Sequence, residues 1–108
     1  MIRGDFVTLA MQGGFGKPRT ALVIQSDQFN EHATVTVLLV SSALVDAPLF
    51  RVIVQPTPGN GLQKPSQVMV DKAMTVKRDK LGEVLGSASD AAMLEIGRCL
   101  AVFLGIAR

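Results

Sequence analysis

The chain has 108 residues, 48% of them hydrophobic, which suits one compact domain over residues 1–108 and leaves no room for two. Eleven Lys and Arg against nine Asp and Glu give a net charge of +2, which excludes a histone-like tail and a polybasic membrane anchor. The single cysteine, Cys99, excludes an internal disulfide, and the single histidine, His32, excludes two-histidine zinc sites and two-histidine acid–base catalysis. We therefore expect a protein that uses no metal and no cofactor.

Targeting signals are not evident. No segment approaches the roughly 20 apolar residues that a membrane-spanning helix needs. Asp5 stands where a signal peptide would begin its apolar run. These features predict a cytoplasmic protein with no membrane contact. The chain has five Phe but no Trp and no Tyr, so it lacks the aromatic platform of common single-strand binders.

The first half of the chain predicts three strands. Phe6–Met11 predicts a strand, with Val7, Leu9 and Met11 on one face and the residues between them on the other. The glycine-rich stretch Gln12–Pro18 that follows predicts an exposed loop. Arg19–Gln25 predicts a strand buried on both faces because Ala21–Ile24 is apolar throughout. Thr34–Ser41, rich in Val and Thr, is the strongest strand pattern in the chain.

The second half predicts shorter strands and one helix. Strands are expected at Phe50–Gln55, Ser66–Asp71 and Met74–Lys77. The Ser87–Ser89 stretch offers helix N-caps, and apolar residues at helical spacing continue to Leu104. Turns are expected at Ser26–His32 and Thr57–Gly61.

Five or six short strands followed by one helix predict a mainly β fold, a small β-barrel with an appended C-terminal helix. On one face of that helix we expect buried apolar residues: Met93, Ile96, Gly97, Leu100, Phe103 and Leu104. The opposite face carries Leu94, Ala101 and Val102, so it is not fully polar either. A helix that is apolar on both sides indicates a second buried surface, such as a dimer interface.

Few residues could carry chemistry. Arg19 follows the glycine-rich loop, where its guanidinium is either a solvated strand-edge group or a clamp for phosphate oxygens. Ser41 and Ser42 end the third strand, where hydroxyls commonly satisfy backbone groups. Asp71 ends the fifth strand, with the pattern of an exposed turn acid. The basic concentration is either a solvated face or a nucleic-acid track; it consists of Lys64, Lys72, Lys77, Arg78 and Lys80.

A series of different short motifs extends along nearly the whole chain. They are Arg3–Val7, the glycine-rich loop, Arg19–Ile24, Phe29–Asn30, Leu39–Ser42, Gly61–Ser66, Val70–Asp71, Leu81–Gly86 and Leu104–Ile106. In this order they resemble the toxins of the MazF/PemK family. The resemblance implies an SH3-like β-barrel with a C-terminal helix, usually a homodimer. It also implies metal-independent, sequence-selective cleavage of single-stranded RNA, chiefly mRNA, and silencing by an antitoxin that we expect to be acidic and partly disordered.

The resemblance also implies roles for particular residues. Arg19 matches the catalytic arginine, Ser41 falls where the family commonly has a catalytic threonine, and Asp71 matches an acidic position near the active site. The expected contacts to the RNA come from Lys17, Ser42, Lys64 and Lys72. The chain departs from the family pattern in three places: Thr20 follows the arginine in place of proline, Ser41 replaces threonine, and Met69 stands where some members have a second arginine.

Two other functions stay open. CcdB-like toxins share this fold and poison DNA gyrase, and they end their helix in Trp-Gly-Ile. This chain has Leu104-Gly105-Ile106 and no tryptophan. The other alternative is a non-catalytic SH3-like binding module, which binds Pro-rich peptides in an aromatic groove that five Phe without Trp or Tyr make difficult to build.

Overall fold

The computed structural model describes residues 1–10 and 17–108. Within these ranges the chain forms a six-stranded sheet and one C-terminal α-helix, α1, Asp90–Phe103. The strands are β1 Asp5–Leu9, β2 Arg19–Val23, β3 Thr34–Ser41, β4 Arg51–Val54, β5 Ser66–Lys77 and β6 Leu81–Ser87. Two short 3-10 helices, η1 Asp27–Phe29 and η2 Arg78–Lys80, complete the elements. Met11 and most of the predicted Gln12–Pro18 loop lie outside the described residues.

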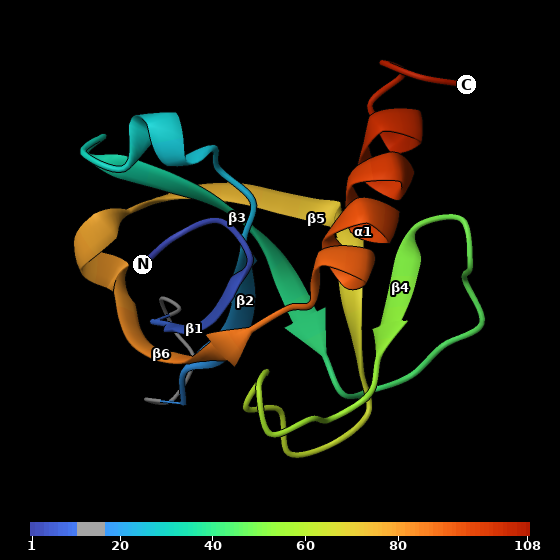
Figure 1. The fold of residues 1–108 in the computed structure, drawn as a ribbon, viewed down its shortest axis with the longest axis horizontal. Coiled ribbons are helices and arrows are strands. Elements are labelled where there is room, and N and C mark those ends of the chain that lie inside the picture. The colour runs from blue at the N-terminus through green and yellow to red at the C-terminus, as the bar shows by residue number, and fades with distance from the viewer. Residues whose placement is uncertain (11–16) are drawn as a thin grey trace.

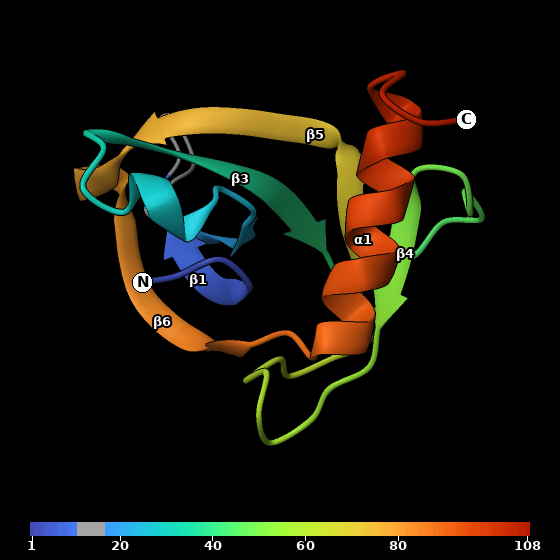
Figure 2. The ribbon, with the colours of Figure 1, turned by 45° about the horizontal axis from the view of Figure 1, so that its top comes forward.

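All paired strands are antiparallel, in the order β4-β5-β3-β2-β1-β6. Figures 1 and 2 show the sheet curling round on itself, with α1 standing beside β4 and β5. Among the described strands, β4 and β6 each pair with one neighbour, so the sheet is not closed by hydrogen bonds. The predicted mainly β fold with a C-terminal helix is confirmed, and the predicted barrel is a strongly curved, open sheet.

The core has two parts, which lie on opposite faces of the same strands. Phe6, Leu22 and Leu38 belong to one cluster, which Ile96 of α1 completes. Val7 and Val37 belong to the second cluster. Because neighbouring residues in a strand point to opposite faces, a run of consecutive apolar residues contributes to both clusters at once. The prediction that the strand within Arg19–Gln25 is buried on both faces is confirmed for Ala21–Val23, whose side chains enter the two clusters, while Ile24 is half-buried.

Residues 66–77 form one strand of 12 residues where the sequence predicts two short ones. β5 pairs with β3 along this whole length, but the register shifts between Leu38, which faces Ala73, and Leu39, which faces Met69. The three extra residues of β5 form a bulge at Val70–Lys72, which overlaps the predicted break between Asp71 and Met74.

β6 is a strand that the sequence pattern does not predict. Its glycines, Gly82 and Gly86, and its exposed Glu83 are typical of a loop. The segment becomes a strand because it pairs with β1, with two register irregularities between Phe6 and Leu9. Tertiary pairing therefore overrides local propensity here.

The helix begins as predicted. The Ser89 hydroxyl accepts a hydrogen bond from the Ala92 N–H at 3.1 Å, and Asp90 lies in the first turn. Ile96 is buried, and Met93, Cys99 and Leu100 pack partly against the first cluster. The prediction for the last turn is wrong, because Phe103 and Leu104 are exposed.

Candidate active site

The start of β2 and the end of β3 meet at one edge of the fold. Thr20 pairs with Val40 in the antiparallel register, so Arg19 lies beside Ser41. A groove of about 240 Å³ opens here, lined by Pro18, Arg19, Thr20, Val40, Ser41, Ser42 and Ser66. The structure therefore brings together two of the predicted catalytic residues, Arg19 and Ser41, with the predicted RNA contact Ser42.

Arg19 is the cation of this groove. It is the first residue of β2, pairs with Leu9 of β1, and is exposed. Among residues 1–10 and 17–108, no carboxylate lies within ion-pair distance of its guanidinium. A guanidinium that no acid neutralises is available to bind an anion. Thr20 stands where the family commonly has proline. At this position β2 pairs with β1 on one side and with β3 on the other.

Ser41 is half-buried and its hydroxyl is oriented by the following segment. The Ala43 N–H donates to Ser41 Oγ at 3.0 Å. Because this bond uses an acceptor site of the hydroxyl, the Ser41 O–H stays available as a donor. A hydroxyl donor beside a guanidinium suits the oxygens of a phosphodiester.

A second hollow of about 280 Å³ continues from the groove, since Thr20, Ser42 and Ser66 line both. It extends to Lys64, which is exposed at its rim. The Ser66 hydroxyl donates to the Lys64 carbonyl at 2.9 Å, which fixes the backbone at this position. Arg19, Ser42 and Lys64 thus line one continuous surface.

The loop beneath Lys64 is held by a buried amide. Asn60 Oδ1 accepts from the N–H groups of Thr57 and Leu62, each at 3.0 Å, and its Nδ2 donates to the Gln55 carbonyl at 2.8 Å. The next residue, Gly61, has φ +70°, and a Cβ there would collide with the carbonyl of Leu85. The loop therefore lies directly against β6, and its position is tightly determined.

Asp71 and Lys72 lie elsewhere. Both belong to the β5 bulge, whereas Ser41 pairs with Gln67, four residues before Asp71 and five before Lys72, or up to about 13 and 17 Å along the strand. Neither residue lines the two hollows. Asp71 Oδ2 lies 3.7 Å from Lys72 Nζ, and its Oδ1 is buried without a hydrogen-bond partner among the described residues. The structure does not bring this pair to Arg19 within one chain.

Lys17 is exposed, two residues before Arg19, and lines neither hollow. Within residues 1–10 and 17–108 there is no group of three or more His, Cys, Asp or Glu side chains placed to hold a metal ion. Over the same ranges, no helix combines the length and the apolar character needed to cross a bilayer.

Sequence reasoning missed Gln67, a polar residue in an otherwise apolar strand. Its side chain is 3% exposed. Gln67 Nε2 donates to the Val45 carbonyl at 2.7 Å, and its Oε1 accepts from the Val45 N–H at 3.0 Å and from Arg51 Nη1 at 3.2 Å. Gln67 thereby holds the segment that follows Ser41 and Ser42. The signal that could have revealed it is an amide at a position where the strand pattern calls for an apolar side chain.

The comparisons with known proteins agree on one family. A family model described as a PemK-like, MazF-like toxin of type II toxin–antitoxin systems matches residues 2–104. A protein of Mycolicibacterium smegmatis named probable endoribonuclease MazF is 44% identical over 108 residues, which cover 99% of each chain.

Solved structures show the same fold. An endoribonuclease in complex with its cognate antitoxin, from Mycobacterial species, has a TM-score of 0.81 and 25% identity, covering 100% of this chain and 98% of the other. A MazE–MazF structure from Deinococcus radiodurans has a TM-score of 0.78 and 23% identity, covering 99% of this chain and 98% of the other. The family resemblance of the sequence motifs is thereby confirmed: the chain belongs to the PemK/MazF family of type II toxin–antitoxin toxins.

Proposed function

We propose that this chain is an endoribonuclease toxin that cleaves single-stranded RNA, chiefly mRNA, at selected sequences and without a metal ion. The observation that carries the proposal is the shared groove of Arg19 and Ser41 at the joined ends of β2 and β3. The relative from Mycolicibacterium smegmatis, which carries the name of an endoribonuclease, supports the reaction class. An mRNA substrate places the toxin in the cytoplasm.

The reaction needs little from the protein because RNA carries its own nucleophile. The 2′-oxygen attacks the adjacent phosphorus, the bond from phosphorus to the 5′-oxygen breaks, and a 2′,3′-cyclic phosphate and a 5′-hydroxyl result. One proton leaves the 2′-hydroxyl and one is added to the 5′-oxygen. The protein has to hold the in-line geometry and stabilise the charge that develops on the phosphate oxygens.

Arg19 and Ser41 supply these contributions. A guanidinium stays protonated in proteins, so Arg19 stabilises the developing negative charge rather than donating a proton. Ser41 donates its O–H to a phosphate oxygen, since its Oγ already accepts from Ala43. Ser42, Lys64 and Lys17 contact flanking phosphates. DNA lacks the 2′-hydroxyl and is therefore not cleaved.

Asp71, as the proton acceptor, and Lys72, as an RNA contact, stay proposals that rest on the sequence resemblance. The Asp71→Asn variant tests the first. Loss of cleavage would assign the carboxylate a catalytic role. The bound RNA would then have to extend along β5 as far as Asp71. Retained cleavage would confine the catalytic set to Arg19 and Ser41.

Two partners belong to this function. We propose a homodimer, because large apolar side chains are exposed on the segment before and within β4: Leu44, Val45, Leu49, Phe50 and Ile53. We also propose an acidic, partly disordered antitoxin. The solved endoribonuclease that was found with its cognate antitoxin supports this partner.

The deciding experiment is cleavage of a long single-stranded RNA in excess EDTA. Wild type is compared with Arg19→Ala and Ser41→Ala, and with Lys77→Ala, which removes an exposed cation that pairs with Thr34 at the opposite end of β3 from Ser41. We expect wild type and Lys77→Ala to cleave and the two groove variants to lose at least about 100-fold in rate. If folded wild-type protein cleaves no RNA, the function is wrong, and a gyrase-type protein target takes its place.

A further inference from the structure

The second hollow, of about 280 Å³, has an apolar wall beside the groove of Arg19 and Ser41. Leu62 and Leu85 line it, and both are half-buried because they also pack against the first core cluster. In single-stranded RNA the unpaired bases can turn away from their neighbours and enter a protein pocket. An apolar wall next to a phosphate-binding groove therefore suits the face of a base.

The loop that forms this wall is fixed on both sides of Gln63. Before it, the Leu62 N–H donates to Asn60 Oδ1 at 3.0 Å. After it, the Ser66 hydroxyl donates to the Lys64 carbonyl at 2.9 Å. The loop therefore presents the Gln63 side chain from a defined backbone position, which lowers the entropic cost of binding a ligand.

Gln63 differs from the amides that lie nearest to it in the fold. The side chains of Asn60 and Gln67 are buried, and they bind backbone groups of this chain. The side chain of Gln63 is exposed and lines the hollow. Its carbonyl oxygen and its amide N–H groups are thus available to a molecule that enters the hollow.

The other polar groups of the hollow distinguish bases less well than an amide does. Lys64 only donates, and the Ser66 hydroxyl already donates to the Lys64 carbonyl. The hydroxyls of Thr20 and Ser42 can turn to donate or to accept, so they suit any base. The Gln63 amide holds a donor beside an acceptor. This pair matches the exocyclic amine and the adjacent ring nitrogen of adenine.

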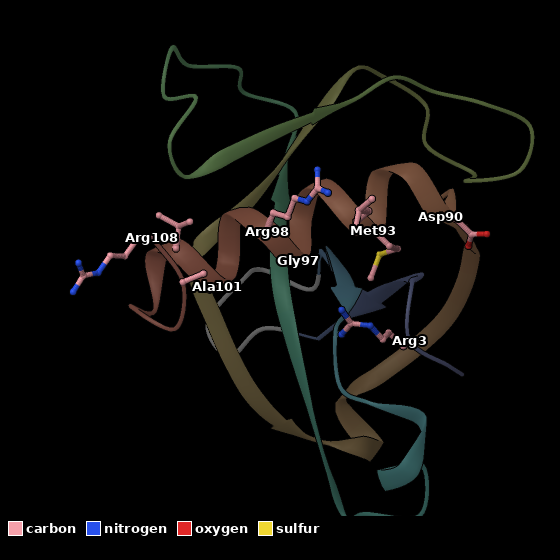
Figure 3. Close-up of a pocket in the computed structure, with 10 residues that line it drawn as sticks. Arg3, Asp90, Met93, Gly97, Arg98, Ala101 and Arg108 are labelled. Atoms are coloured by element: carbon pink, nitrogen blue, oxygen red, sulfur yellow. The ribbon is translucent and has the colours of Figure 1, made fainter.

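The largest groove in the described part of the chain is not continuous with this surface. It has a volume of about 750 Å³ and runs along α1, and Figure 3 shows Asp90 and Arg108 at its two ends. It shares no described lining residue with the groove of Arg19, whereas the smaller hollow shares three. A nucleotide next to a phosphate bound at Arg19 therefore reaches the smaller hollow.

We propose that the smaller hollow holds one unstacked adenine of the RNA, with its face against Leu62 and Leu85 and its edge hydrogen-bonded to the Gln63 amide. Gln63 is then a specificity-determining residue: it selects the sequence that is cut, whereas Arg19 and Ser41 act on the phosphate. The inference rests on the proposed function, because the base belongs to the RNA substrate of that function.

The test is the cleavage of a pool of RNA with randomised sequence, in which every cut is mapped. Wild type should prefer adenine at one position at a fixed distance from the cut. Gln63→Ala should lower that preference about tenfold, while the preferences at other positions and the rate on sequences without this adenine stay unchanged. Gln63→Glu should move the preference at the same position toward guanine, because a carboxylate only accepts and guanine offers two adjacent N–H donors.

Gln28→Glu is the matched control, since Gln28 is exposed in η1 and lines neither hollow. A binding measurement separates the inference from the proposed cleavage. Oligomers of adenosine and of uridine with 2′-O-methyl groups lack the nucleophile, and fluorescence anisotropy gives their affinities. We expect the preference for the adenosine oligomer to fall about tenfold in Gln63→Ala and to stay at the wild-type value in Gln28→Glu. This result stands even if wild type cleaves no RNA, in which case the proposed cleavage alone fails.

Four outcomes overturn the proposal. An unchanged base preference in both Gln63 variants, or the same change in Gln28→Glu, would show that the amide reads no base. An equal loss on all sequences in folded Gln63→Ala would leave Gln63 a structural role only. A change at a position where wild type prefers another base would refute the assignment to adenine. Failure of wild type to bind either oligomer would show that the hollow holds no base.

Discussion

Gln67 shows how one buried amide determines the position of a site that it does not touch. Its three hydrogen bonds connect β5 to Val45 and Arg51, and Arg51 Nη1 also reaches the Ala43 carbonyl at 3.4 Å. The Ala43 N–H in turn donates to Ser41 Oγ. The position of the Ser41 hydroxyl therefore depends on a side chain from the neighbouring strand.

Replacing Gln67 tests this dependence. In Gln67→Leu, the N–H and C=O of Val45 lose their partner, which we expect to lower the free energy of unfolding by about 2 kcal/mol. RNA cleavage should fall about tenfold, because the segment after Ser41 moves. Urea denaturation and RNA cleavage measure the two effects. Gln28→Leu, at an exposed position in η1 that lines neither hollow, is the control and should leave both unchanged. Normal cleavage in Gln67→Leu would refute the positioning role.

Cys99 gives a second prediction at this scale. Its thiol donates to the Leu49 carbonyl at 3.0 Å, and burial, followed by the nearby charge of Glu95, raises the pKa of the thiol. A raised pKa leaves less reactive thiolate at neutral pH, and the fraction grows as the pH rises. We expect the folded protein to react with Ellman's reagent at pH 7.5 at least ten times more slowly than in urea. Equal rates in the two states would contradict the protection.

At the scale of elements, the loop that carries Lys64 depends on close contact with β6. The Ser87 N–H donates to the Gly59 carbonyl at 2.9 Å, and a Cβ on Gly86 would collide with the backbone of Gly59 and Asn60. The loop and the strand can approach this closely because the strand residue has no side chain.

The Gly86→Ala variant tests this contact. We expect it to lower the free energy of unfolding by about 2 kcal/mol, because the backbone has to move apart to accept the methyl group. The matched control is Gly59→Ala, in the same loop, where the added Cβ would lie 3.9 Å from Thr57 Oγ1. Thermal melts of both variants against wild type measure the difference. Equal melting temperatures for Gly86→Ala and wild type would show that the loop is not held as described.

The elements also show what the sequence can and cannot predict. β3 and the start of α1 were predictable because alternating Val and Thr residues and a serine cap are local signals. β6 was not, since its pairing with β1 joins residues about 80 positions apart and outweighs two glycines. Arg19 and Ser41 were singled out from the sequence as candidates, and the register brings them together in one groove, as their proposed roles require. The support from Gln67 was not, because no local pattern reveals which loop a buried amide contacts.

At the scale of the whole molecule, the apolar surface around β4 remains uncovered in a single chain. Leu49 is 82% exposed and Ile53 is 57% exposed, and the Leu49 backbone lies against Cys99 of α1. β4 also pairs with one neighbour among the described strands. An edge strand flanked by large exposed apolar side chains is a surface that another chain commonly covers.

A double variant, Leu49→Asp with Ile53→Asp, tests whether this surface forms the homodimer. Light scattering after size-exclusion chromatography should give twice 11.5 kDa for wild type and 11.5 kDa for the variant, because two buried carboxylates on each side oppose association. Val84→Asp, at a position that is 47% exposed on β6, is the control and should stay dimeric. If Val84→Asp is monomeric and the double variant is not, the interface lies at the opposite edge of the sheet.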